Sequence, residues 1–186
     1  MLIVTQFMIK RNVKKLTLKV IAFILLLIIS PLFFLISALL YLYSTQKPKI
    51  IFSQKRIGIQ QKEFIIYKFK TMEKNQVTFL GKFLRKTGID EIPQLINIIK
   101  GEMSFVGPRP LMKEDIDRLG WTEKQHLKRW SVKPGITGSA QLQNTCSADL
   151  SLANDLSYVK NKSLFLDLRI FMRSIFIPIL GKKHTQ

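Results

Sequence analysis

Cysteine, histidine and acidic residues are all scarce in this sequence of 186 residues. A single cysteine, Cys146, excludes an internal disulfide framework and a cysteine-based zinc site. His126 and His184 are too few for a histidine-rich metal centre, and a Ser-His-Asp hydrolase would depend on His126, which lies in a charged segment. Only 12 Asp and Glu residues accompany 30 Lys and Arg residues, so the formal net charge is +18. We therefore expect an anionic partner: nucleic acid, a membrane or a phosphorylated substrate.

Charged residues are absent from residues 20–43, which read VIAFILLLIISPLFFLISALLYLY. A run of about 18 apolar residues is long enough to suggest a membrane segment. This run is too long for the core of a signal peptide, and no small-residue cleavage site follows it. A buried core helix is the alternative, but the run has no polar face. The sequence therefore predicts a membrane segment.

Two features indicate that this segment enters and leaves the membrane on the same side. Ser30 and Pro31 lie near its middle, where proline removes a helix hydrogen bond and predicts a kink or break. Both flanks are basic, and such flanks prefer the cytoplasm, which only a re-entrant helix allows for both. A proline-kinked helix that spans the membrane is the alternative. The flanking cations are Lys10, Arg11, Lys14, Lys15 and Lys19 before the run, and Lys47, Lys49, Lys55 and Arg56 after it.

The rest of the chain predicts an α+β fold that is mostly helical and has a small β element. Alternating apolar residues in 50–72 predict two short strands around a turn, and another strand is expected after residue 103. Residues 73–79 and 132–142 read as a polar link and a Pro/Gly loop. The last helix is amphipathic, and it can lie in the membrane interface or close a core. Helices are expected over 80–86, 91–100, 112–130, 149–161 and 163–180.

Asp90 and Glu91 are the first candidates for chemistry. They precede Pro93 at the start of an expected helix, so they can be read simply as a helix cap and first-turn acid. A helix N-terminus also attracts phosphate, and carboxylates there can attack phosphorus or hold Mg²⁺. Both carboxylates could reach one phosphate only if the helix begins at this point.

Arg109 is the second candidate, because the prolines on both sides stiffen its backbone. A guanidinium on a rigid loop suits a phosphate clamp, although the same sequence can be a simple rigid turn. Lys68, Lys70 and Arg85 could line the same phosphate site. Each of these three can also be read as a cation that faces solvent or lipid.

Four motifs occur in order: QKRIG, FIIYKFKTM, LGKFLRKTGIDEIPQLINIIKGEMSFVGPRPL and VKPGITGSAQL. From about Lys14 to Leu180 the chain resembles the bacterial sugar transferases that initiate glycan assembly, the monotopic phosphoglycosyl transferases. That family has a re-entrant helix broken at a Ser-Pro pair, which Ser30-Pro31 matches. The resemblance implies a basic N-terminus and membrane hairpin in residues 1–46. It also implies a cytoplasmic, membrane-associated catalytic domain in residues 47–186, with amphipathic interfacial helices.

The resemblance also implies a reaction. A UDP-sugar would donate its sugar-1-phosphate to undecaprenyl phosphate at the cytoplasmic face of the bacterial inner membrane, and UMP would leave. Asp90 would be the nucleophile that forms a phosphosugar-aspartyl intermediate, and Glu91 with Asp90 would handle Mg²⁺. Arg109, Lys68, Lys70 and Arg85 would bind the phosphates of the substrates. Anionic lipids are expected partners, a homo-oligomer is left open, and nucleic acid is disfavoured because paired aromatic platforms are scarce.

The sequence departs from the family after the Pro-Gly-Ile-Thr-Gly stretch. The arginine expected near Thr145 is absent, and Ser139 replaces an aromatic residue often found before Ala140. These departures motivate an alternative, a catalytically impaired member of the family. A membrane-attached basic protein that binds anionic lipids is the other alternative.

Overall fold

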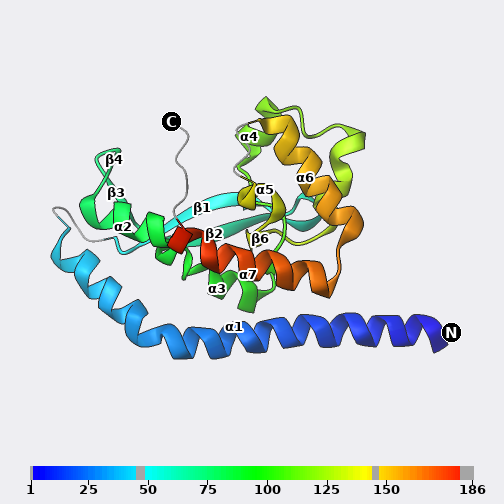
Figure 1. Ribbon diagram of the computed structural model, residues 1–186, viewed down its shortest axis with the longest axis horizontal. Coiled ribbons are helices and arrows are strands. Elements are labelled where there is room, and N and C mark those ends of the chain that lie inside the picture. The colour runs from blue at the N-terminus through cyan, green and yellow to red at the C-terminus, as the bar shows by residue number, and fades with distance from the viewer. Residues whose placement is uncertain (1, 45–48, 144–146, 181–186) are drawn as a thin grey trace.

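The computed structural model describes residues 2–44, 49–143 and 147–180, and helices hold most of them (Figure 1). The predicted mostly helical α+β class with a small β element is confirmed. Its strands form three two-stranded sheets, β1 (Ile51–Ile57) with β2 (Glu63–Phe69), β3 (Met72–Glu73) with β4 (Gln76–Val77), and β5 (Ser104–Val106) with β6 (Gly135–Thr137). Its helices are α1 (Leu2–Leu42), α2 (Phe79–Thr87), α3 (Gln94–Lys100), α4 (Lys113–Arg118), α5 (Ser139–Leu142), α6 (Ala148–Asn161) and α7 (Leu164–Leu180), with 3₁₀ turns η1 (Ile59–Gln61), η2 (Ile89–Glu91) and η3 (Lys124–Ser131).

Helix α1 runs along one side of the molecule and bends partway along its length (Figure 1). At Ser30 and Pro31, where the sequence predicts a kink or break, α1 continues as one helix with Pro31 inside it. Ser30 Oγ donates a hydrogen bond to the carbonyl oxygen of Leu27, 2.7 Å away. Because proline has no N–H, the helix loses one hydrogen bond at Pro31. A long helix can bend at such a point and still continue.

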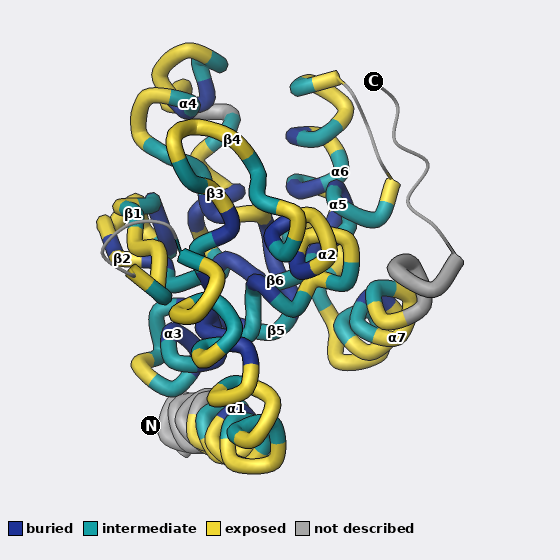
Figure 2. Tube along the Cα trace, turned by 90° about the vertical axis from the view of Figure 1, so that its left-hand side faces the viewer, coloured by how far each residue is buried: buried dark blue, intermediate teal, exposed yellow. Residues whose placement is uncertain are grey.

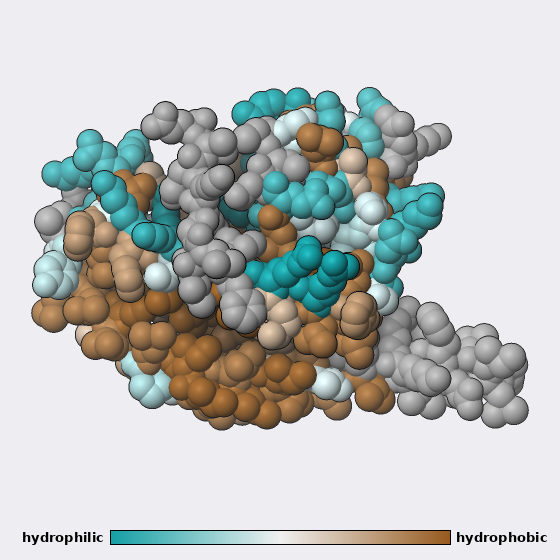
Figure 3. Space-filling model, in the orientation of Figure 1, coloured by the Kyte–Doolittle hydropathy of each residue, from teal (hydrophilic) through white to brown (hydrophobic). Residues whose placement is uncertain are grey.

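Most of the apolar surface of α1 between residues 16 and 42 is exposed. Its segment Leu16–Leu42 has a mean hydropathy of 2.9, and only 11% of its most apolar window is buried. Figure 3 shows this surface as a continuous apolar belt on the side of the molecule that α1 forms. Ala22 and Ile36 are the buried exceptions, and they pack against side chains of the hairpin and of α2 and α3, such as Phe64, Phe69 and Ile98. The helix is thus attached to the fold and compatible with membrane association.

The β1–β2 hairpin follows the alternation that the sequence predicts. The two strands are antiparallel, with Ile51 opposite Phe69 and Ile57 opposite Glu63. Phe64 and Ile66 point into the core, and Lys68 continues the same face of β2 because side chains alternate along a strand. Lys68 therefore lies on the same face of β2 as Phe64 and Ile66, at the edge of the candidate site.

Three expectations about connections are corrected. One helix over 112–130 is wrong, because α4 ends at Arg118 and Gly120 adopts a φ of +66°, after which the chain forms η3. The link 73–79 contains the β3–β4 hairpin, whose turn residues Lys74 and Asn75 have φ of 46° and 62°. The loop 132–142 contains β6, which pairs in parallel with β5. The paired residues are Ser104 with Gly135 and Val106 with Thr137, each 31 positions apart, so this parallel pairing leaves no local pattern in the sequence.

Helix α7 closes a core and also leaves an apolar face uncovered. Ile170 is buried against Val106 and Tyr158, so the helix closes a core, which is one of the two roles that the sequence allows for it. In Figure 2 buried segments gather around β5 and β6, whereas α1 and α7 lie at the edge of the molecule. Within residues 164–175, the part of α7 whose side chains the structure describes, the large exposed apolar residues are Leu164, Phe165, Leu168, Met172 and Ile175.

Candidate active site

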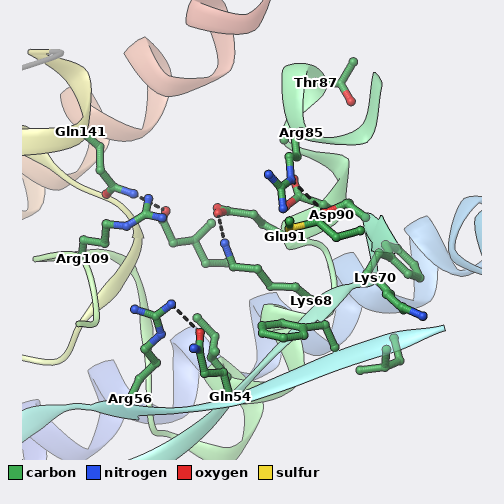
Figure 4. Close-up of a pocket in the computed structure, with 18 of the residues that line it drawn as sticks. Gln54, Arg56, Lys68, Lys70, Arg85, Thr87, Asp90, Glu91, Arg109 and Gln141 are labelled. Atoms are coloured by element: carbon green, nitrogen blue, oxygen red, sulfur yellow. Dashed lines mark hydrogen bonds and ion pairs between the residues drawn. The ribbon is translucent and has the colours of Figure 1, made fainter. Parts of the chain in front are cut away.

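A groove of about 1720 Å³ lies between the β1–β2 hairpin, α2 with η2, and the loops that follow β5 and β6 (Figure 4). Ligand pockets typically measure about 300–1,000 Å³, so this groove has room for more than one substrate. The structure brings every residue that the sequence predicts for catalysis, metal or phosphate binding to this groove. They are Asp90, Glu91, Lys68, Lys70, Arg85 and Arg109.

The two carboxylates lie in a tight turn between α2 and α3. Helix α2 ends at Gly88, whose φ of +74° reverses the chain, and η2 follows immediately. The expected helix start at Asp90 is wrong, because α3 begins only at Gln94 after Pro93. Asp90 therefore does not cap α3, and the simple capping interpretation loses its support. The 3₁₀ turn instead presents two consecutive carboxylates to the groove.

Asp90 is buried in the wall of the groove, with 8% of its surface exposed. Burial raises the pKa of its carboxyl group, and the negative charge of Glu91 raises it further. The positive charges of Lys68 and Arg85 oppose this rise. Lys68 Nζ lies 2.6 Å from Glu91 Oε1, so the neighbouring carboxylate is already paired. The site holds a destabilised carboxylate among cations, which favours a reactive group.

Arg85 is fixed at the same end of the groove by Thr71. Its Nε donates to Thr71 Oγ1 at 2.8 Å, and Thr71 is buried. Helix α2 can approach this threonine because of Gly81, where an added Cβ would lie 2.1 Å from the Thr71 carbonyl oxygen. Lys70 also lines the groove, but in Figure 4 its ammonium group points away from the carboxylates.

A buried ion pair, which the sequence analysis did not identify, holds the Arg109 loop. Arg129 Nη2 donates to the Arg109 carbonyl oxygen at 2.7 Å, and Arg129 Nε donates to Asp155 Oδ2 at 2.9 Å. Both charged side chains are only 2% exposed, and the Arg129 guanidinium lies 5.2 Å and 4.6 Å from the ring centroids of Trp121 and Trp130. Burial lowers the pKa of Arg129 and raises that of Asp155, while their mutual attraction opposes both shifts.

Arg56 is a second groove residue that the sequence analysis did not place in the site. It lies on β1, and its Nη2 donates to Gln54 Oε1 at 2.6 Å while Nη1 donates to the Pro110 carbonyl oxygen at 3.4 Å. Burial lowers the pKa of Arg56, and the nearby charge of Arg109 lowers it further. Arg56 lies in the motif QKRIG, and this motif was the one feature of the sequence that could have pointed to it.

The carboxylates could hold a divalent cation only with help from a ligand. Among the described residues, no group of three or more His, Cys, Asp or Glu side chains is arranged for a metal ion. Mg²⁺ commonly binds one or two carboxylates together with substrate phosphates and water. Asp90 and Glu91 fit that pattern. Thr145, where the family arginine is absent, lies outside the described residues.

Comparison with known proteins gives a consistent result. The sequence model of a family described as "Bacterial sugar transferase" matches residues 9–181. An uncharacterized sugar transferase, EpsL, of Bacillus subtilis (strain 168) is 41% identical over 140 residues, covering 68% of this chain and 68% of the relative.

Two longer relatives carry more specific names. A UDP-N-acetylgalactosamine-undecaprenyl-phosphate N-acetylgalactosaminephosphotransferase of Aeromonas hydrophila is 35% identical over 71% of this chain and 36% of its own length. A UDP-glucose:undecaprenyl-phosphate glucose-1-phosphate transferase of Klebsiella pneumoniae is 33% identical over 88% of this chain and 39% of its own length. The chain thus spans less than half of these two proteins.

Proposed function

Since the chain belongs to the bacterial sugar transferase family, we propose that it moves a sugar-1-phosphate from a UDP-sugar to undecaprenyl phosphate. Relatives are named for transfers of this kind with two different sugars. The observation that carries the proposal for this chain is the buried Asp90 carboxylate beside the Lys68–Glu91 pair, inside a groove with further arginines. The product would initiate a bacterial exopolysaccharide or capsule.

The reaction would proceed in two displacements at phosphorus. A carboxylate oxygen of Asp90 bonds to the phosphorus that carries the sugar, the bond from this phosphorus to the bridging oxygen of the diphosphate breaks, and UMP leaves with the bond electrons. An oxygen of undecaprenyl phosphate then attacks the same phosphorus and releases the Asp90 carboxylate. Glu91, together with Asp90, would hold Mg²⁺, which supplies neutralisation of the charge that develops on UMP.

The membrane would deliver the second substrate. The exposed apolar belt of α1 and the uncovered face of α7 are the surfaces that we assign to lipid. With basic residues on both flanks of the apolar run, α1 would be re-entrant and the protein monotopic on the cytoplasmic face of the inner membrane. Cations near an anionic leaflet each contribute about 1 kcal/mol to attachment.

UMP release tests this function. The full chain in membranes is given Mg²⁺, undecaprenyl phosphate and a panel of UDP-sugars. We expect UMP from at least one donor, together with a lipid-linked sugar diphosphate. An anionic-lipid-binding protein would release none, and a catalytically impaired member would bind UDP without turnover. Either of these two results would contradict the proposal.

Lys68→Met should move the pH dependence of adduct formation on Asp90 to higher pH. The variant removes a positive charge that lowers the pKa of Asp90 and leaves Glu91 without its partner, so the pKa of Asp90 rises further. A larger fraction of Asp90 is then protonated at any given pH. The measurement is burst UMP release with UDP-sugar alone, since the acceptor phosphate titrates too. Lys82→Met, at an exposed position on α2, is the matched control. An unmoved pH midpoint in Lys68→Met would contradict this electrostatic role.

Membrane topology gives another expected result. Single cysteines at Lys10 and Lys47, in a Cys146→Ser background, should both resist a membrane-impermeant thiol reagent in intact cells and react once the membrane is opened. Pro31→Leu restores a backbone donor and removes the ring clash, so a straighter helix should let a fraction of molecules span the membrane. The basic N-terminus opposes that inversion, so the shift should be partial. Labelling of the residue-10 cysteine alone from outside would show that the wild-type helix spans.

A further inference from the structure

Arg56 is a half-buried cation whose hydrogen-bond partners among the described residues are all uncharged. Its guanidinium donates to Gln54 Oε1 and to the Pro110 carbonyl oxygen, and its buried Nε has no hydrogen-bond partner among the described residues. Asp115 and Glu114 act on it only at a distance, since neither forms an ion pair with it among the described residues. A buried charge is costly unless an opposite charge pairs with it.

A second arginine increases this cost. Arg109 follows Pro108 in the loop after β5, and its positive charge disfavours the charged form of Arg56. Figure 4 shows the two guanidinium groups along the same side of the groove, with the Lys68–Glu91 pair between them and Arg85 with Asp90. Among the described residues, Arg109 forms no ion pair with a carboxylate either. Two adjacent guanidinium groups that face one groove, neither of them in an ion pair with a carboxylate among the described residues, favour an anionic ligand.

The groove therefore has two cationic ends. Lys68 and Arg85 surround Asp90 at one end, and Arg56 and Arg109 lie at the other. This division matches a substrate with two linked phosphates. If Asp90 attacks the phosphate that carries the sugar, that phosphate must lie at the Asp90 end. The other phosphate, which leaves with the nucleoside, must then lie beyond it, because attacking and leaving oxygens are roughly in line.

We propose that Arg56, together with Arg109, binds the phosphate of the departing nucleoside monophosphate. This inference rests on the proposed function and assigns a role within its first step. Planar guanidinium groups can bind phosphate oxygens through two parallel hydrogen bonds, and they stabilise the charge that develops on the leaving group. Gln54 fixes the orientation of the Arg56 fork through its 2.6 Å contact and acts as a positioning residue.

Measuring adduct formation and adduct discharge separately distinguishes binding of the leaving phosphate from binding of the acceptor phosphate. With UDP-sugar alone, Arg56→Gln should form the Asp90 adduct about ten- to a hundredfold more slowly than wild type, because a charge-assisted contact to phosphate is lost. Arg56→Lys should recover only part of the rate, since a point charge cannot replace the fork. Discharge of preformed adduct by undecaprenyl phosphate should be unchanged in both variants, because the nucleotide has already left. Arg118→Gln, with a 75% exposed side chain on α4, is the control for loss of one positive charge.

Direct binding of UDP with Mg²⁺ provides the independent measurement. Arg56→Gln should weaken UDP binding about tenfold or more, and Arg118→Gln should not.

If wild type forms no adduct and releases no UMP, the proposed function fails, whereas the UDP measurement still decides whether Arg56 binds the nucleotide. Unchanged UDP affinity and adduct formation in Arg56→Gln would overturn the inference. Slower discharge with normal formation would also overturn it and assign Arg56 to the acceptor phosphate. Equal losses in both half-reactions with a lowered melting temperature would show a structural role only.

Discussion

Replacing Asp90 with asparagine is expected to abolish UMP release, with a fall of roughly three orders of magnitude or more. An amide has almost the shape of a carboxylate but cannot form the bond to phosphorus that the first displacement needs. The fold should tolerate the change. Burial and the charge of Glu91 raise the pKa of Asp90, which means that the ionised carboxylate is destabilised in the folded state. A neutral amide removes that cost, so the melting temperature should stay the same or rise.

This pairing of lost activity with retained stability distinguishes a nucleophile from a structural acid. Asp117→Asn makes the same chemical change at an exposed position on α4, and it should leave both quantities unchanged. Membrane association of Asp90→Asn should equal that of wild type. UMP release near the wild-type rate in Asp90→Asn would contradict the nucleophile assignment.

Replacing Arg129 with methionine should lower the free energy of unfolding by about 3–5 kcal/mol, because it leaves the Asp155 carboxylate buried without its partner. The double variant Arg129→Met/Asp155→Leu should recover most of this loss, since apolar residues can replace a buried ion pair. UMP release should not recover in the double variant. The carbonyl oxygen of Arg109 would still lack the donor that now lies 2.7 Å away.

Chemical denaturation in detergent or nanodiscs measures the stability change. Lys55→Met is a suitable control, because Lys55 and Glu63 form an exposed pair with 79% and 53% of their side-chain surfaces accessible. Such pairs contribute at most about 1 kcal/mol. A loss below about 1 kcal/mol in Arg129→Met would show that the buried pair does not hold this part of the fold. Full activity in the double variant would show that it does not position the Arg109 loop.

Local patterns in the sequence predicted the parts of the fold that depend on local physics. Alternation placed Phe64 and Ile66 in the core, and Gly88 ended a helix as expected. The Ser30-Pro31 pair does not interrupt α1, because the effect of one proline depends on whether the surrounding helix can bend. The helix start at Asp90 was wrong because the chain forms a 3₁₀ turn before Pro93, a choice that local composition does not decide.

The candidate site, like the fold, has residues that local sequence patterns predicted and residues that they did not. The residue types and motifs pointed to Asp90, Glu91 and Arg109, and the groove brings them together with the predicted cations. Arg129 and Asp155 were missed because they lie 26 residues apart and become partners only in the folded chain. Arg56 was read as a flanking cation, and only the register of β1 against β2 places it on the groove. Pairing of this kind is a property of the tertiary structure.

Mass spectrometry of the trapped enzyme tests the central claim most directly. The full chain is mixed with Mg²⁺ and the UDP-sugar that gives the highest UMP release, without acceptor, then quenched and digested. We predict a mass increase of one sugar-phosphate on the peptide that contains Asp90, its disappearance when undecaprenyl phosphate is added before the quench, and its absence in Asp90→Asn. Complete turnover with acceptor but no adduct at any quench time, or an adduct on another residue, would contradict the account.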